Sequence, residues 1–335
     1  MTTRRVAAID CGTNSIRLLI ADINSKTEDD VERSVGSPDS PPPLTDVARE
    51  MRIVRLGEGV DRTGRLSEAA LDRTMTALRE YAALIEAAAP EAIRMVATSA
   101  TRDAANAQEF TDRVVAVLGV PPEVISGDAE ARLSFTGATR ELLGTALGKG
   151  PCAPPYLVTD IGGGSTEFVL GDPESVREGG QVVGRSVNIG CVRLTERHLH
   201  TDPPKPTEIA ATTADIDAAL QEAAASVPVT EARTLVGLAG SVTTVAGIAL
   251  GLPGYDSARI HHSRVPAARV HEIALELLAM TRAERAAIPV MHPGRVDVIG
   301  AGALILDRIM NRFGFAEVLV SEHDILDGIA WSLVP

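Results

Sequence analysis

The chain has 335 residues, of which 45% are hydrophobic and 23% are charged, an ordinary composition for a globular protein. This length exceeds what one hydrophobic core usually serves, so we expect two domains. The formal net charge of −13 argues against a nucleic acid or membrane partner, and no run of eighteen apolar residues is present.

The N-terminal residues and the cysteines predict a cytoplasmic protein. Residues 4–10 hold two arginines and reach an aspartate within five further positions, which leaves no room for the apolar core of a signal peptide. The three cysteines, Cys11, Cys152 and Cys191, include no closely spaced pair and fit a reducing compartment.

In the first part of the chain, strand signals alternate with helix signals. Residues 5–23 predict a β-hairpin, because two apolar runs flank a short polar turn. Residues 24–50, rich in Ser, Asp and Pro, predict a surface excursion. The elements expected next are a strand at 51–56, a helix at 67–89 with Ser67 as N-cap and a strand at 93–97. The segment 98–103 then opens a helix at 106–118, and a strand ends at 124–125.

The second part continues the alternation. We expect a helix from residue 126, a Gly/Pro-rich linker at 144–155, a second hairpin at 156–172, and a strand–turn–helix unit at 235–250. Residues 321–324 resemble a capping box that opens an amphipathic C-terminal helix. Strands that alternate with helices predict an α/β protein.

The two predicted hairpins are similar to each other. Sliding Val6–Asp22 by 150 positions onto Tyr156–Asp172 superposes Asp10 on Asp160, Gly12 on Gly162 and Ser15 on Ser165 without a gap. Such a repeat predicts two related domains, with the two hairpins facing each other across a cleft.

The residue types of this repeat are typical of a phosphate site. Turns made of small residues let backbone amides approach phosphate oxygens closely. Carboxylates at Asp10 and Asp160 beside a phosphate require a hard cation between them, and Mg²⁺ fits. Arg17 stands where the second copy has Glu167, so we expect one half to hold phosphate and the other to hold metal or water. Residues 237–244 add a Gly-Ser turn at a helix N-terminus, a third candidate anion site.

Two other patterns are excluded as functional sites, one as a zinc site and one as a P-loop. The histidines at 198 and 200, and the pair at 261 and 262, lack the accompanying ligands of a zinc site. Residues 144–150 imitate a P-loop, but they lack one spacer residue and have Gly where Ser or Thr must follow Lys149.

Taken together, the motifs resemble the exopolyphosphatase/guanosine pentaphosphate phosphatase family, within the actin, sugar kinase and Hsp70 ATPase superfamily. The match runs in order from residue 6 to the C-terminus. The segments that carry it are 10–17, 97–102, 125–132, 160–167, 237–244 and 295–302. The resemblance implies two actin-like (ribonuclease H-like) domains across a phosphate-binding cleft. They would comprise residues 1–125 and 126–320, with a helix at 321–335 packing back onto the first.

The resemblance also assigns roles to single residues. It implies that Glu130 is the general base for the attacking water and that Glu167 assists metal and water. It implies metal ligation by Asp10, Asp160 and Glu167. Substrate phosphates would be bound by Thr13, Asn14, Ser15, Arg17, Arg102, Gly163, Gly164, Ser165, Gly240, Ser241 and Arg295. This sequence departs from the family at Asp128-Ala129, which leaves Glu130 as the one glutamate of its motif.

The function we expect is exopolyphosphatase activity, in which water attacks the terminal phosphate of polyphosphate with the help of Mg²⁺ or Mn²⁺. Long family members carry an added helical domain that this chain is too short to contain, so shorter polyphosphates are the expected substrates. Three alternatives stay open: a guanosine pentaphosphate (pppGpp) phosphohydrolase, a kinase of the same superfamily and a non-catalytic sensor. An aromatic content of 3% offers little stacking surface for a base and favours polyphosphate. A homodimer is implied by the resemblance alone.

Overall fold

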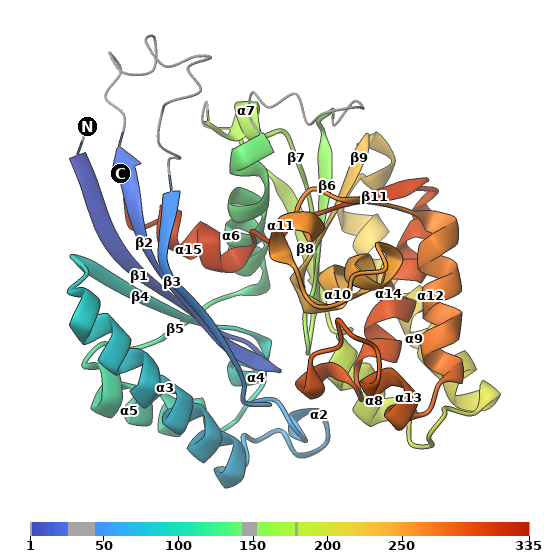
Figure 1. Ribbon diagram of the computed structural model, residues 1–335, viewed down its shortest axis with the longest axis horizontal. Coiled ribbons are helices and arrows are strands. Elements are labelled where there is room, and N and C mark those ends of the chain that lie inside the picture. Colours follow the sequence, from blue (N-terminus) through green and yellow to red (C-terminus); the bar gives the residue numbers. More distant parts are fainter. Residues whose placement is uncertain (1, 26–43, 143–152, 178–179, 335) are drawn as a thin grey trace.

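The computed structural model describes residues 2–25, 44–142, 153–177 and 180–334. Two β-sheets, each with helices packed against it, stand side by side (Figure 1). Across the described residues, no helix is long and apolar enough to cross a membrane.

The first sheet has five strands in the order β3-β2-β1-β4-β5. β1 and β2 form the predicted antiparallel hairpin, β3 pairs antiparallel with β2, and β4 and β5 follow in parallel. The strands are β1 (Thr2–Cys11), β2 (Ser15–Ser25), β3 (Leu44–Ile53), β4 (Ala92–Ala97) and β5 (Glu123–Val124); the helices are α2 (Val60–Thr63), α3 (Glu68–Ala88), α4 (Ser99–Arg102) and α5 (Ala107–Leu118). Ser67 caps α3 as predicted, because its side chain accepts a hydrogen bond from the Ala70 amide.

The second sheet has six strands in the order β10-β11-β9-β6-β7-β8. Its strands are β6 (Tyr156–Ile161), β7 (Thr166–Gly171), β8 (Val183–Val187), β9 (Thr234–Leu238), β10 (Arg264–Pro266) and β11 (Glu317–Val320). The α-helices of this part are α6 (Gly127–Thr139), α7 (Pro173–Arg177), α8 (Cys191–His198), α9 (Pro206–Ser226), α10 (Ala239–Ala249), α11 (Ser257–Ile260), α12 (Ala267–Ala279), α13 (Arg282–Ala286), α14 (Ile299–Phe313) and α15 (Ile325–Trp331).

The two sheets repeat one topology. Read from β8, the order β8-β7-β6-β9-β11 has the same sequence of antiparallel and parallel pairings as β3-β2-β1-β4-β5. In the hairpins, Asp10 lies directly opposite Arg17, and Asp160 lies opposite Glu167. The predicted α/β architecture with two actin-like halves is therefore confirmed, and the hairpin repeat is its local signature.

Two local predictions differ from the structure. Residues 44–50 belong to β3 rather than to a surface excursion; this edge strand leaves most of its side chains at least partly exposed, so it lacks a strong apolar pattern. The C-terminal helix begins at Ile325 with Asp324 as N-cap, because Ser321 forms its own turn with the backbone of His323. Residues 26–43 and 143–152, which include Cys152 and the P-loop-like stretch, lie outside the described residues.

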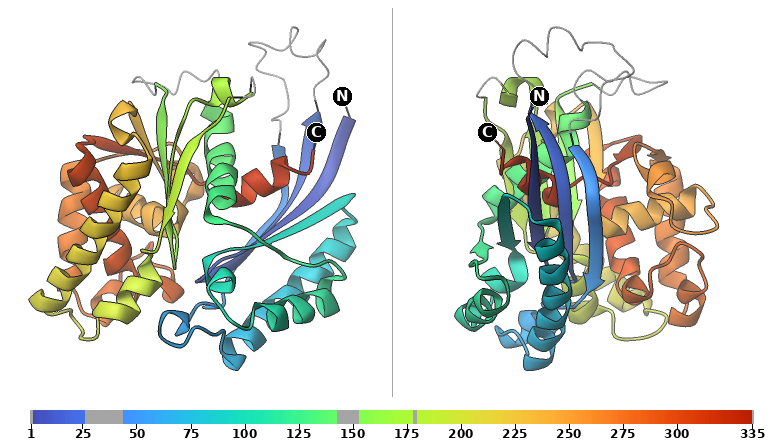
Figure 2. Two further views of the ribbon diagram at one scale, coloured as in Figure 1. Left: turned by 180° about the vertical axis from the view of Figure 1, so that it is seen from behind. Right: turned by 60° about the vertical axis from the view of Figure 1, so that its left-hand side comes forward.

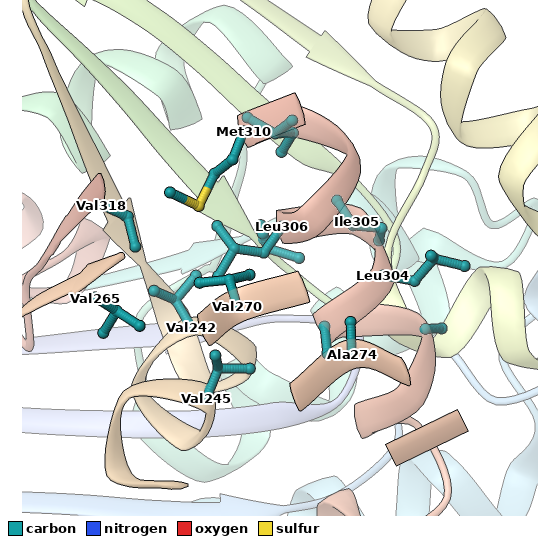
Figure 3. Packing of buried hydrophobic residues seen from close by; sticks show 14 of the residues in the cluster. Val242, Val245, Val265, Val270, Ala274, Leu304, Ile305, Leu306, Met310 and Val318 are labelled. Carbon is teal, nitrogen blue, oxygen red and sulfur yellow. The ribbon is translucent and has the colours of Figure 1, made fainter. Parts of the chain in front are cut away.

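Each sheet has its own core. In the second half, the helices α10, α12 and α14 pack against one face of the sheet, and their aliphatic side chains interdigitate (Figure 3). In the first half, α3 and α5 cover one face of the sheet. The other face is covered by α15, the short red helix beside the blue strands (Figure 2). Its side chains Leu326, Ile329 and Trp331 pack with Val6 and Leu19.

Helices α6 and α15 cross between the two halves with their backbones in contact. A Cβ atom on Gly137 of α6 would lie 1.8 Å from the carbonyl oxygen of Asp324. A Cβ atom on Gly328 of α15 would lie 2.0 Å from the carbonyl oxygen of Leu133. The predicted domain boundary at residue 125 falls between β5 and this α6 helix.

Candidate active site

A cavity of about 90 Å³ lies between the turns of the two hairpins. Residues at or near the N-terminal ends of α4, α6, α8, α10, α14 and α15 also line it, so segments far apart in the sequence meet there. Thirteen of the predicted site residues line it: Asp10, Thr13, Asn14, Ser15, Arg17, Glu130, Asp160, Gly163, Ser165, Glu167, Gly240, Ser241 and Arg295. The other two, Arg102 and Gly164, do not line it but contact residues that do.

The two hairpin turns have the same backbone geometry and touch each other. In the first turn the Gly12 amide donates to the Ser15 carbonyl at 2.9 Å, and in the second the Gly162 amide donates to the Ser165 carbonyl at 3.0 Å. A Cβ atom on Gly164 would lie 2.6 Å from the Thr13 hydroxyl, so only glycine fits this approach. The paired turns therefore present small residues and backbone amides to one place, as a phosphate requires.

Glu130 is buried, with 7% of its surface exposed, at the start of α6. Ser126 caps this helix, and Nη1 of Arg102 donates to Oε2 of Glu130 at 3.0 Å. Burial, and secondly the charge of Glu167, raise the pKa of Glu130 well above its usual range, while Arg102 opposes the shift. A carboxyl group with a raised pKa in a cavity is suited to accept a proton near neutral pH.

Asp160 and Glu167 lie opposite each other on β6 and β7, and each is oriented by a serine. Ser134 donates to Oδ2 of Asp160 at 2.8 Å, and Ser186 donates to Oε1 of Glu167 at 2.7 Å. Burial and the charge of Glu167 raise the pKa of Asp160 to about 8. Burial also raises the pKa of Glu167.

The cavity's carboxylates have the chemistry of ligands for a divalent cation, although among the described residues no three of them bring ligand atoms within 4.8 Å of one another. Glu130, Asp160 and Glu167 are buried together, and the raised pKa values of the first two reflect both burial and the charge of Glu167. A hard cation with oxygen ligands would relieve this repulsion. Oδ1 of Asn14 is also buried without a hydrogen-bond partner within the described ranges, as expected for a group that faces a ligand.

Arg17 and Asp10 form an ion pair across the first hairpin. Nη2 and Nε of Arg17 donate to Oδ2 of Asp10 at 2.6 and 3.0 Å, and Nη1 donates to Asp324. Burial raises the pKa of Asp10, although Arg17 acts in the opposite direction. Arg17 thus reaches the cavity as predicted, but two carboxylates already bind it.

An arginine lies against the Gly240-Ser241 turn, the third candidate anion site. A Cβ atom on Gly240 would lie 2.1 Å from Cζ of Arg295, so the guanidinium lies directly on the backbone of this turn. Nη1 of Arg295 is 3.4 Å from the Thr244 hydroxyl. No ion-pair partner of Arg295 is found among the described residues, so its charge is available to an anion.

A second, larger chamber of about 450 Å³ adjoins the cavity and shares Arg17, Gly240 and Arg295 with it. Its remaining wall includes apolar residues before α14, the ring of Tyr255 and several acids. The hydroxyl of Tyr255 donates to Glu322 at 2.6 Å. The low aromatic content predicted little stacking surface, yet the fold places one of the three tyrosines here.

Three half-buried groups form a separate cluster beyond this chamber. Potential ligand atoms of Glu141, His261 and His323 lie within 4.8 Å of one another, although the sequence spacing of the histidines predicted no metal site. Oε2 of Glu141 lies 3.0 Å from Nδ1 of His323 and 3.4 Å from Nε2 of His261. Nδ1 of His261 accepts the Glu322 amide at 3.1 Å. His261 therefore carries its proton on Nε2, which is the nitrogen a metal would need.

The sequence did not indicate several residues that support the site. Ser134, Ser186 and Asp324 orient the acids and Arg17, and no motif distinguishes the two serines from ordinary polar residues. Asp324 had one usable signal, its place in the predicted capping box. Nor did the sequence indicate that Arg102 would bind Glu130, while the adjacent Asp103 is bound by Arg193.

Comparison with known proteins places this site in context. A model of the Ppx/GppA phosphatase family matches residues 33–335. Exopolyphosphatase 2 of Mycobacterium tuberculosis is 48% identical, with 99% of each chain covered. The guanosine-5'-triphosphate,3'-diphosphate pyrophosphatase of Aeromonas salmonicida is 28% identical over 98% of this chain, which spans 59% of that protein. The crystal structure of an exopolyphosphatase-like protein superposes with a TM-score of 0.87 at 40% identity, covering 98% of both chains.

Proposed function

Because this chain belongs to the Ppx/GppA phosphatase family, we propose that it is an exopolyphosphatase that removes the terminal phosphate of inorganic polyphosphate. The observation that carries the proposal is the placement of Glu130, a buried carboxyl group with a raised pKa, against two touching phosphate-type turns. Similarity to a relative named Exopolyphosphatase 2 over the whole chain supports the same substrate. We propose the cytoplasm as its compartment and shorter polyphosphates as its substrates.

The chain's own residues account for the proton and for the phosphate. Glu130 takes a proton from the attacking water, and Arg102 holds the carboxylate in its orientation through the 3.0 Å bond. A general base in this role contributes about 10²–10⁴-fold to the rate. Amides of the turns at Thr13–Ser15 and Gly163–Ser165, together with Ser241 and Arg295, bind the phosphate oxygens.

A divalent cation, for which we propose Mg²⁺ with Mn²⁺ as a substitute, would be held by Asp10, Asp160 and Glu167. When bound, it neutralises charge on the phosphoryl oxygens. Ser134 and Ser186 keep two of these carboxylates in place, and Arg17 keeps the third. Ser15 and Ser165 are not required as nucleophiles, because no histidine that could activate them lines the described cavity wall.

A second substrate is favoured by one observation. The chamber beside the cavity has a volume of about 450 Å³ and contains Tyr255, which is enough room and surface for a nucleoside next to the phosphate site. A relative from Aeromonas is named for activity on guanosine-5'-triphosphate,3'-diphosphate. Hydrolysis of pppGpp at its 5' end is therefore the alternative that we retain, ahead of a kinase or a sensor.

The deciding experiment measures phosphate release from short polyphosphate, long polyphosphate, pppGpp and ATP, with Mg²⁺ and with EDTA. Glu130→Gln tests the base. Asp128→Asn is its matched control, since Asp128 lies on the same turn of α6 but is exposed and outside the cavity. Metal-dependent release from polyphosphate that is lost only in Glu130→Gln supports the proposal. Selective release from pppGpp would change the substrate, and release from none of the four would refute the hydrolase.

A further inference from the structure

The guanidinium of Arg17 is shared between two carboxylates from opposite ends of the chain. Nε and Nη2 donate to Asp10 at 3.0 and 2.6 Å, and Nη1 donates to Oδ2 of Asp324. A guanidinium has five N–H donors, so these three bonds leave two, one on each Nη nitrogen. Arg17 lines both the cavity and the chamber, which means that these two donors are available to a phosphate there.

Asp324 is itself held rigidly. Its Oδ1 accepts the Leu326 amide at 3.0 Å as the N-cap of α15, and its own amide donates to Oδ2 of Asp327 at 3.0 Å. Only 4% of its surface is exposed. Helix α15 is in turn fixed by backbone contact with α6. The carboxylate of Asp324 therefore stays in place, and the longer side chain of Arg17 must adapt to it.

This arrangement orders Arg17 before any substrate arrives. An arginine side chain has many rotamers, and fixing one in advance avoids the entropy loss when the ligand binds. Asp10 alone would not do this, because Arg17 could then turn fully onto its cross-strand partner. The second carboxylate holds the guanidinium between Asp10 and α15, at the wall that the cavity and the chamber share.

We propose that Asp324 is a positioning residue that fixes Arg17 for phosphate binding, an inference that rests on the proposed phosphohydrolase function. Asp327 provides a strict comparison. It lies on the first turn of the same helix, is equally buried, and also binds an arginine of the first sheet, Arg49 of β3, at 2.5 Å. Arg49 lines the chamber but not the cavity.

The test compares Asp324→Asn with Asp327→Asn in the full chain. Asparagine keeps the shape of each side chain and removes its charge. For Asp324→Asn we expect kcat/KM on tripolyphosphate to fall about 10- to 100-fold, because a displaced binding group has effects of this size. For Asp327→Asn, whose side-chain oxygen can still accept the Asp324 amide, we expect less than a threefold change. Both variants should lower the melting temperature, since each loses a buried ion pair.

Binding gives a readout that does not depend on turnover. Calorimetric titration of tripolyphosphate into the Glu130→Gln chain should show about tenfold weaker binding after Asp324→Asn is added, and little change after Asp327→Asn. An equal loss of affinity in both variants would show that Asp324 acts only by docking α15. No loss of affinity in either would show that Asp324 does not position Arg17. If the wild-type chain releases no phosphate, the proposed function fails, yet this binding comparison still decides the role of Asp324.

Discussion

Replacing Gly137 by alanine tests how tightly the position of α6 controls the site. The added Cβ would lie 1.8 Å from the Asp324 carbonyl oxygen, 1.6 Å short of the 3.4 Å at which ordinary contact begins. The neighbouring atom belongs to the backbone, so no side chain can turn away. Helix α6 must therefore shift against α15, and Glu130 lies seven residues, about 10 Å, along the same helix.

Two opposing effects set the expected result. Alanine is a better helix former than glycine, which would stabilise the chain by about 0.5–1 kcal/mol. Overpacking costs about 1–3 kcal/mol, so we expect a net loss of stability. Displacement of the base by about 1 Å should lower kcat roughly 10²-fold. Gly254→Ala is the control, because nothing lies within 4 Å of the added atom.

The assay is phosphate release from tripolyphosphate, with a melting curve for each variant. A Gly137→Ala chain that melts at or above the wild-type temperature and turns over within threefold of it would refute the reasoning. An equal loss in Gly254→Ala would refute it as well, since that position has open space.

Three further predictions use other contacts. Arg102→Met removes the cation that opposes the raised pKa of Glu130, so the acid limb of the pH–kcat/KM profile should move to higher pH; a move to lower pH would contradict this. Burial lowers the pKa of His262 to about 4, so the chain should lose stability as the pH falls from about 6.5 toward 4, and melting curves of His262→Gln should lose that part of the decline. Asp61→Asn breaks bonds of 2.6–3.1 Å from Arg193 and Arg197 that join α2 to α8 across the two halves. Solution scattering should then show a more open chain, whereas Asp215→Asn, which removes a partner of Arg197 within one half, should not.

Local patterns were sufficient for the parts of the fold that depend on local physics. The hairpins could be predicted because apolar runs of strand length flank a turn of small residues, and the offset of 150 positions revealed that the halves are related. Ser67 could be assigned as a helix cap because a cap stands next to its helix in the sequence. Strand β3 was placed too late, since an edge strand buries few side chains and carries little apolar pattern.

Contacts between distant segments could not be predicted in this way. Arg102 meets Glu130 across two helices, and Arg17 meets Asp324 across 307 positions, so no spacing in the sequence reports either pair. The family resemblance identified which residues line the cavity. Their partners, Ser134, Ser186 and Asp324, depend on how this chain packs, and only the structure places them.

The position of α15 has a consequence for biosynthesis. Val6 and Leu19 enter the nascent chain about 300 residues before Ile329 and Trp331, which cover them in the folded protein. At about 5–20 residues per second, a ribosome needs roughly 15–60 s to bridge that interval. Throughout it, one apolar face of the first sheet has no cover from α15. The first half of this protein is therefore the last to be completed, and a chain released early would leave the ribosome with that face open to chaperones or to aggregation.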